Sequence, residues 1–270
     1  MDIDKDIKFG PHTLRIRKQK GGFAGIIVGQ SSSPEIAATA EQVRDLLIKR
    51  CGEQAPDFVG LAGARARFLK LFPNGFLDAK FIGDGKFEGE RAYKLLASEQ
   101  LRNVLPLSSV ANAADEGLIA LRAMQKTNLL DPFTKAKLGE VLRGQRASEF
   151  IRLVADFAEG EIDDSCASLN RHFQNEGVNT WVCLTYFPFL WKPESHMFLK
   201  PEFTRTFAER IGHRFQFDYE TRPNPKTYAS LLHLTDTVRA ALSDMQPKDN
   251  IDIHSFMWAT VEYLDSDVGL

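Results

Sequence analysis

The sequence has few cysteines, no long apolar run and almost no excess of one charge. Its three cysteines, Cys51, Cys166 and Cys183, are far apart and lack the CxxC or Cys/His spacing of a zinc site, so no metal is predicted. The longest apolar run, residues 181–191, is far shorter than the ~20 residues of a membrane-spanning helix. The net charge of −2 excludes a basic field over the whole protein but leaves room for a local basic patch.

The usual signatures of catalysis are also missing. There is no GxxxxGK[ST] phosphate loop, no GxSxG nucleophile turn and no HExxH metal motif. Glycines cluster at positions 21–29, but they lie between or within two predicted strands, whereas a dinucleotide fingerprint needs its glycines between a strand and a helix. The acidic start MDIDKDIKFG has no apolar core, which is unlike a secretory signal. We therefore expect a cytoplasmic protein with buried, reduced thiols and no membrane partner.

Apolar residues recur at helical spacing over most of the chain, which predicts a mainly α, multi-helix globular fold. The first thirty residues differ: residues 13–18 alternate, a glycine pair follows, and residues 23–28 are rich in β-branched side chains. That pattern predicts a small N-terminal β-hairpin. The segment Ser-Ser-Ser-Pro at 31–34 predicts the start of the first helix. A short alternation at 215–219 allows one further strand.

The acidic stretch at 159–164 is the best candidate for a domain boundary. It is polar, contains Gly160 and lacks the ordered oxygen ligands of a calcium loop, so we interpret it as a linker. The predicted parts are a β-hairpin element at 1–30, a helical domain at 31–160 and a mainly helical C-terminal domain at 161–270. The alternative is that the two helical parts form one continuous domain.

A cluster of cations on the predicted hairpin is the most suggestive feature of the sequence. It consists of Arg15, Arg17, Lys18 and Lys20. A basic hairpin with a flexible glycine turn can lie along the phosphates of DNA or RNA. A second group of cations extends the cluster if its helix packs nearby, and it consists of Arg65, Arg67 and Lys70. The alternative is an ordinary exposed strand whose charges protect a sheet edge from aggregation.

A glycine-rich stretch carries the candidate catalytic residues. Asp84, Glu88 and Glu90 precede Lys94, and carboxylates that hold Mg²⁺ beside a lysine are typical of metal-dependent phosphodiesterases. Magnesium is the cofactor under this hypothesis, and no other cofactor is predicted. The alternative is a solvated loop in which Glu90 and Lys94 form an exposed i,i+4 pair at the start of a helix.

An aromatic segment supplies the candidate pocket residues. His196 and Lys200 follow Trp191 at the end of this segment, and the three together can line a pocket for an anionic ligand. The alternative is a histidine that is satisfied inside a hydrogen-bonded loop. His254, one helical turn before Trp258, is interpreted as structural, although an imidazole beside a buried aromatic stripe can respond to pH.

Five segments resemble a family of uncharacterised bacterial proteins as a set. They are RARFLKLFPNGF (65–76), ERAYK (90–94), FLWKP (189–193), HMFLKP (196–201) and NIDIHSFMW (250–258). The last segment is similar to segments of modification-dependent restriction and other defence proteins. The resemblance covers residues 56–260 and implies no catalytic residue, and the hairpin lies outside it. The phosphate loop of the restriction motors is missing, which argues against a motor role.

Three classes of function follow from these observations. The first is a nucleic-acid-associated accessory or binding protein, in bacterial defence, whose contacts are on the basic hairpin. The second is the metal-dependent nuclease described above. The third is a scaffold that binds other proteins through the aromatic sequence at 186–191.

Overall fold

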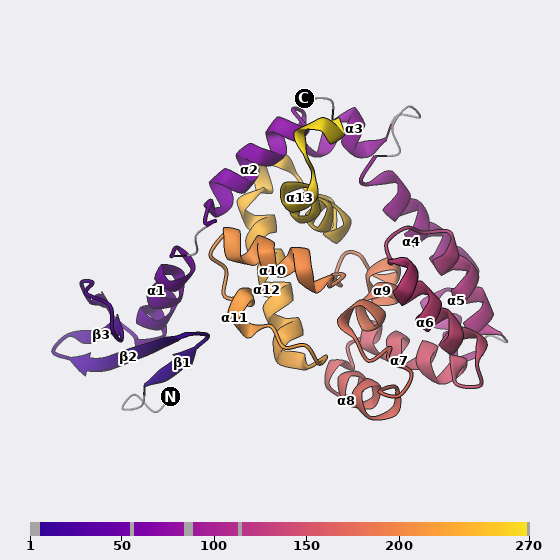
Figure 1. The fold of residues 1–270 in the computed structure, drawn as a ribbon, viewed down its shortest axis with the longest axis horizontal. Coiled ribbons are helices and arrows are strands. Elements are labelled where there is room, and N and C mark those ends of the chain that lie inside the picture. Colours follow the sequence, from indigo (N-terminus) through magenta and orange to yellow (C-terminus); the bar gives the residue numbers. More distant parts are fainter. Residues whose placement is uncertain (1–5, 55–56, 84–88, 113–114, 269–270) are drawn as a thin grey trace. The chain divides into compact units, whose positions relative to one another are not determined.

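The computed structural model describes residues 6–54, 57–83, 89–112 and 115–268, and its fold is mainly α with one N-terminal sheet (Figure 1). The strands are β1 (Ile7–Phe9), β2 (His12–Gln19), β3 (Gly22–Ile27) and β4 (Glu35–Ala37). The helices are α1 (Ala40–Gly52), α2 (Gly60–Leu71), α3 (Ala79–Ile82), α4 (Ala92–Val104), α5 (Glu116–Gln125), α6 (Pro132–Arg143), α7 (Ala147–Glu159), α8 (Ile162–His172), α9 (Trp181–Trp191), α10 (Pro201–Arg210), α11 (Phe215–Asp218), α12 (Pro225–Ala241) and α13 (Asn250–Glu262). The 3-10 turns are η1 (Gly75–Leu77), η2 (Leu107–Asn112), η3 (Ser243–Met245) and η4 (Asp265–Val268).

The chain forms two compact units. The first contains Met1–Ala64 and Arg205–Tyr219, and the second contains Arg65–Thr204 and Glu220–Leu270. This division differs from the predicted one, because the acidic stretch near residue 160 lies inside the second unit. Gly160 ends α7 in the left-handed conformation, at φ 111°, and α8 begins two residues later and packs against α7. The predicted linker is thus a tight turn between two packed helices.

The first unit is an antiparallel sheet with one face packed on a helix. The strand order is β1-β2-β3-β4, so the predicted hairpin is confirmed as the centre of a larger sheet. Leu14 and Ile16 of β2 and Ile27 of β3 meet Val43 and Leu47 of α1, and none of these side chains is more than 3% exposed. Because side chains alternate along a strand, the residues between them must lie on the opposite, open face.

The glycines of the hairpin have the structural roles that the sequence indicates. Gly21 lies in the β2–β3 turn and Gly22 begins β3, with φ values of 93° and 156°, a conformation that other residues adopt only with strain. Gly25 faces α1, where an added Cβ would lie 2.6 Å from Cγ1 of Val43. These glycines therefore close the turn and allow the helix to approach the sheet.

The first helix begins later than predicted. The segment expected to start a helix leads into β4, and α1 begins after Thr39, whose hydroxyl accepts from the backbone N–H of Gln42. The Gln42 side chain in turn accepts from the backbone N–H of Thr39, which completes a capping box. This reciprocal cap satisfies two backbone N–H groups, and the helix start lies at Thr39 rather than at the Ser-Pro segment.

The alternation at 215–219 does not form a strand. Residues Phe215–Asp218 form the short helix α11, and Asp218 accepts from Nε of Arg214 at 2.6 Å. Phe215 is buried and Phe217 packs on Phe9 of the first unit, with ring centroids 4.6 Å apart. Two large apolar contacts decide the structure here, and three alternating aromatic residues are too few to specify a strand.

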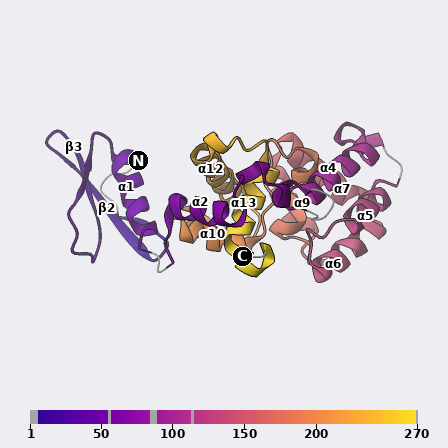
Figure 2. The ribbon, with the colours of Figure 1, turned by 90° about the horizontal axis from the view of Figure 1, so that it is seen from above.

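The core of the second unit is built around α9, which packs against α4 and α7 (Figures 1 and 2). Ten of its eleven residues are buried, so its sequence has no polar face to reveal a helical period. Thr180 caps the helix, and Pro188 lies within it. The aromatic segment at 186–191 is therefore core, which contradicts its use as an exposed interaction surface.

No helix in the described part of the chain is both long and apolar enough to cross a membrane. The three cysteines are free and buried. Burial raises the pKa of the Cys166 thiol to about 12 and that of Cys183 to about 11, which makes both thiols poor nucleophiles.

Candidate nucleic-acid interface

The open face of the N-terminal sheet carries cations and small or aliphatic side chains. In the β2–β3 register Arg15 lies opposite Ile26 and Arg17 opposite Ala24. On the outer strands, Lys8 pairs with Thr13 and is exposed, while Ile36 of β4 lies beside Ala24 and is 63% exposed. The alternation predicted for β2 is thus confirmed: its leucine and isoleucine face α1, and its two arginines face outward.

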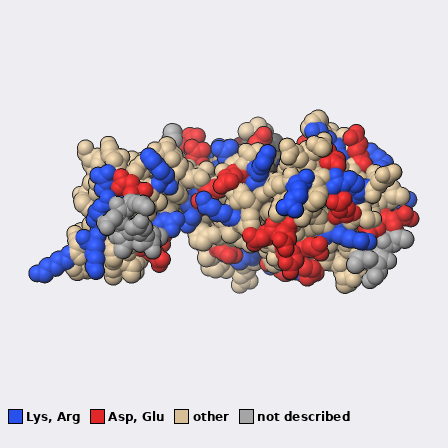
Figure 3. Space-filling view, turned by 90° about the horizontal axis from the view of Figure 1, so that it is seen from below, with Lys and Arg blue, Asp and Glu red and all other residues tan. Residues whose placement is uncertain are grey.

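The basic cluster extends to the turn between β2 and β3. Lys20 lies in this turn, and Lys18 lies near the end of β2, opposite Phe23 on the helix-facing side of the sheet. Both side chains are exposed, and neither has an ion-pair partner among the described residues. In Figure 3, Lys and Arg side chains project from the end of this unit. Residues 7–34 contain five cations and no carboxylate, so the charge of this stretch has a single sign. A surface of this kind attracts polyanions.

One carboxylate just before β1 partly neutralises the cluster. Asp6 accepts from Nε and Nη2 of Arg15 at 2.9 and 2.8 Å, and from Nη2 of Arg17 at 3.5 Å. The hydrogen bonds from Arg15, followed by the charges of both arginines, lower the pKa of Asp6, and Asp6 raises the pKa of Arg15. Arg15 is therefore engaged, whereas Lys18 and Lys20 are available to another anion.

The second group of predicted cations lies in the other unit. Arg65 forms two hydrogen bonds with Asp244 at 2.7 and 2.6 Å. Arg67 and Lys70 both contact Asp265, with Lys70 Nζ 2.6 Å from Oδ2. Each of the three cations is bound to a carboxylate, and these ion pairs link α2 to the C-terminal part of the chain.

The candidate catalytic residues Glu90 and Lys94 form a buried ion pair. Lys94 is 1% exposed, and its Nζ lies 2.5 Å from Oε2 of Glu90 and 2.8 Å from Oγ of Ser255. The hydroxyl of Tyr263 donates to the other oxygen of Glu90. The interpretation as an exposed surface pair is therefore wrong, because α13 covers both side chains. Asp84 and Glu88 lie outside the described residues.

A second buried group adjoins this pair. Arg91 donates to Asp249 at 2.9 and 2.7 Å and to Asp252 at 2.6 Å. Burial opposes the charge of Arg91, but the two carboxylates outweigh it and raise the pKa of Arg91. Burial also lowers the pKa of Lys94, against the attraction of Glu90. These ions join the start of α4 to the start of α13, so Arg91 and both carboxylates are engaged in structural contacts.

The three predicted pocket residues do not meet in one pocket. His196 is 7% exposed, with Nδ1 2.8 Å from the Tyr228 hydroxyl and Nε2 3.0 Å from the carbonyl of Ala158. Trp191 is buried and donates from Nε1 to the carbonyl of Leu105 at 2.9 Å. His196 is thus the satisfied loop histidine of the alternative interpretation, and burial lowers its pKa. Lys200 lines a pocket that contains neither His196 nor Trp191.

His254 is buried without a hydrogen-bond partner. Its ring is 2% exposed, and neither nitrogen has a partner among the described residues. The rings of Phe189, Phe198 and Phe203 surround it, with centroids 5.2 to 5.6 Å away. Burial, and then the charges of Lys94 and Lys200, lower the pKa of His254 well below its ordinary value. The imidazole is therefore neutral in the folded protein.

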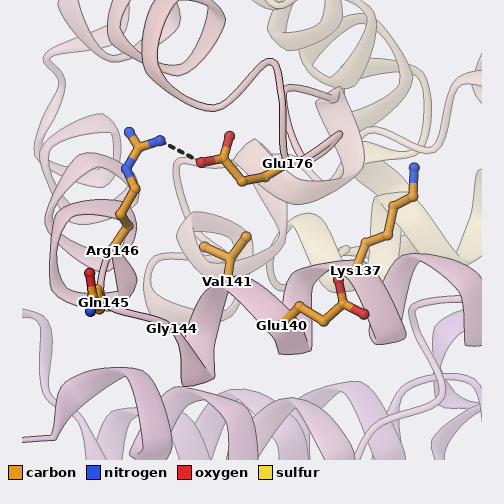
Figure 4. A pocket seen from close by; sticks show the side chains of 7 residues that line it. All are labelled: Lys137, Glu140, Val141, Gly144, Gln145, Arg146 and Glu176. Atoms are coloured by element: carbon orange, nitrogen blue, oxygen red, sulfur yellow. Dashed lines mark hydrogen bonds and ion pairs between the residues drawn. The ribbon is translucent and has the colours of Figure 1, made fainter.

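A pocket of about 260 Å³ beside α6 contains charges that neutralise one another (Figure 4). Arg146 donates to Glu176 at 2.5 Å and to Glu149 at 3.0 Å. Lys137 and Glu140 project from the same helix, α6, at the other side of this pocket. Because Arg146 is already bound to two carboxylates, its guanidinium group is not available to an anionic ligand.

Among the residues that the structure describes, no three His, Cys, Asp or Glu side chains are arranged to hold a metal ion. Comparison of the chain with protein-family models, curated proteins and solved structures finds no match in any of the three.

Two residues of the sheet surface were missed by sequence reasoning. Lys8 was missed because β1 has only three residues, too few for an alternation to show. Asp6 was missed because its partner lies nine residues away, across a turn. The absence of any carboxylate from residues 7–34 is the signal that would have found Lys8.

Proposed function

We propose that the protein binds nucleic acid through the open face of its N-terminal sheet, as an accessory protein of bacterial defence in the cytoplasm. The observation that carries the proposal is the array of exposed cations on one sheet face and its adjoining turn. Lys8, Arg15 and Arg17 lie on the open face and Lys20 lies in the turn, while Lys18 is exposed near the end of β2, on the side of the sheet that it shares with Phe23. The similarity of residues 250–258 to segments of defence proteins supports the wider role.

A duplex is the better ligand than a single strand. Proteins that hold single strands stack the bases on aromatic side chains. The aromatic residues of this sheet, Phe9 and Phe23, belong to its helix-facing core, and the open face presents Ala24, Ile26 and Ile36 between the cations. Such a face offers phosphate contacts and no stacking platform. A sheet or β-ribbon can enter the major groove of a DNA duplex.

The test is a mobility-shift titration of the full chain with duplex DNA, duplex RNA and both single strands across a salt series. We expect duplex binding that weakens with salt. Charge reversal of Arg17, Lys18 and Lys20 to glutamate should reduce affinity on the order of 100-fold and make the salt slope shallower by roughly one unit for each lost phosphate contact.

The matched control reverses three exposed cations of the second unit, which are Arg102, Arg122 and Lys126. Both triple variants change the net charge equally, so a general electrostatic effect would weaken them to the same extent. Equal weakening, or no duplex binding at low salt, would contradict the proposal. Preference for single strands would contradict the argument from the missing aromatic platform.

The nuclease and scaffold hypotheses have no such support among the described residues. The nuclease hypothesis needs carboxylates open to a metal, whereas Glu90 is bound to Lys94 and Tyr263. The scaffold hypothesis relied on residues 186–191, which are core.

A further inference from the structure

A pocket of about 280 Å³ in the second unit combines an indole face with charges of both signs. The residues that matter to the argument are Asp131, Lys200, Glu202, Phe203, Trp258 and Glu262. Asp131 immediately precedes α6. Lys200 immediately precedes α10, and Glu202 and Phe203 lie in the first turn of that helix. Trp258 and Glu262 lie one helical turn apart on α13. The volume suits a small metabolite, since it is near the lower end of the range for ligand pockets.

The aromatic wall already holds one cation. Nζ of Lys200 lies 4.7 Å from the centroid of the Trp258 ring, within the range of a cation–π contact. Phe203 meets the same indole edge-on, with centroids 5.2 Å apart at 84°. The other two tryptophans are buried, and their indole N–H groups donate to backbone carbonyls. Trp258 is half-buried and is the tryptophan that a ligand in this pocket would touch.

Carboxylates outnumber the ammonium group in this pocket by three to one. Burial lowers the pKa of Lys200, while Asp131, Glu262 and Glu202 oppose this effect, in that order. Asp131 accepts from the hydroxyl and the N–H of Thr134 at 2.6 and 2.9 Å, and the hydroxyl bond is the main cause of its lowered pKa. With Lys200 charged, the formal charge of the pocket is −2, which repels anions and attracts cations.

We propose that this pocket binds a small aliphatic organic cation, with its ammonium or guanidinium group at the carboxylates and its carbon chain along Phe203 and Trp258. The inference is independent of the nucleic-acid proposal, because no residue of the sheet takes part. The sequence predicts that Lys200 contacts an anionic ligand, whereas this proposal places a cation in the pocket.

The test uses four ligands with four-carbon chains that differ in charge: butyrate, 4-aminobutyrate, butylammonium and putrescine. Each is titrated into the full chain at low ionic strength, with calorimetry and tryptophan fluorescence as readouts. We expect affinity to increase with ligand charge, on the order of tenfold from butylammonium to putrescine. The fluorescence change should disappear in Trp258→Phe, which keeps an aromatic wall but removes the reporter.

Two charge variants have opposite expected effects. Glu262→Gln should weaken putrescine binding several-fold, whereas Lys200→Met should strengthen it, because the competing ammonium group is removed. Glu140→Gln, in the pocket beside α6, is the control and should leave binding unchanged. Tighter binding of butyrate or 4-aminobutyrate, weaker putrescine binding in Lys200→Met, or no saturable binding of any of the four ligands would overturn the proposal.

Discussion

Two ion pairs with the same i,i+4 spacing show how differently the two units use charge. Lys49 and Glu53 of the first unit are 73% and 44% exposed, with 3.8 Å between nitrogen and oxygen. Glu90 and Lys94 of the second unit are almost fully buried and 2.5 Å apart. A buried charge must be paired, whereas an exposed one can stay free to meet a ligand. Burial, and not spacing, therefore distinguishes these two pairs.

The largest effect is expected from breaking the buried pair. Lys94→Met removes the partner of a buried Glu90 and one hydrogen bond to Ser255. The free energy of unfolding should fall by about 3–5 kcal/mol, since an uncompensated carboxylate remains in the core. Urea denaturation measures the change.

The matched control is Lys49→Met, which breaks the exposed pair of the same spacing and should leave the urea midpoint nearly unchanged. The double variant Glu90→Gln/Lys94→Met should recover part of the lost stability, because it leaves no unpaired charge. Equal effects of Lys94→Met and Lys49→Met would show that burial does not distinguish the two pairs.

A smaller effect concerns pH. The pKa of His254 lies well below 6.5 in the folded protein and returns to about 6.5 on unfolding. Below pH 6.5 His254 binds a proton in the unfolded chain but not in the folded chain. The free energy of unfolding therefore falls as pH falls, by up to about 1.4 kcal/mol per pH unit. Above pH 6.5 the imidazole is neutral in both states and contributes no pH dependence.

His254→Phe tests this assignment, because the new ring suits the surrounding phenylalanines. Denaturation midpoints measured from about pH 7.5 to about pH 5 should decline less steeply in this variant than in the unchanged protein. Since burial also lowers the pKa of His196, some acid sensitivity should remain. Identical slopes for the variant and the unchanged protein would assign the acid sensitivity to other groups.

The sequence was most informative where local patterns and burial agree. The β2 alternation and the Asp131 and Asp249 helix caps were predictable, since each depends on neighbouring residues. Helix α9 was not, because a segment buried on all sides loses its period. The burial of Glu90 and Lys94 depends on α13, about 160 residues away, and no local pattern encodes such a contact. For the same reason the pocket around Trp258, assembled from α6, α9, α10 and α13, was not predicted.

The smallest effect is expected at the exposed salt bridge of the sheet. Asp6 engages Arg15 through two hydrogen bonds and reaches Arg17, so it competes with phosphate for both guanidinium groups. Asp6→Asn should release these groups and tighten duplex binding a few-fold in the mobility-shift assay, with an unchanged thermal midpoint because the pair is solvated. Should binding weaken instead, Asp6 would hold Arg15 in its binding position. In that case the first unit, like the second, would use an ion pair to hold a side chain in place. The contrast in the use of charge between the two units would then rest on Lys8, Lys18 and Lys20 alone.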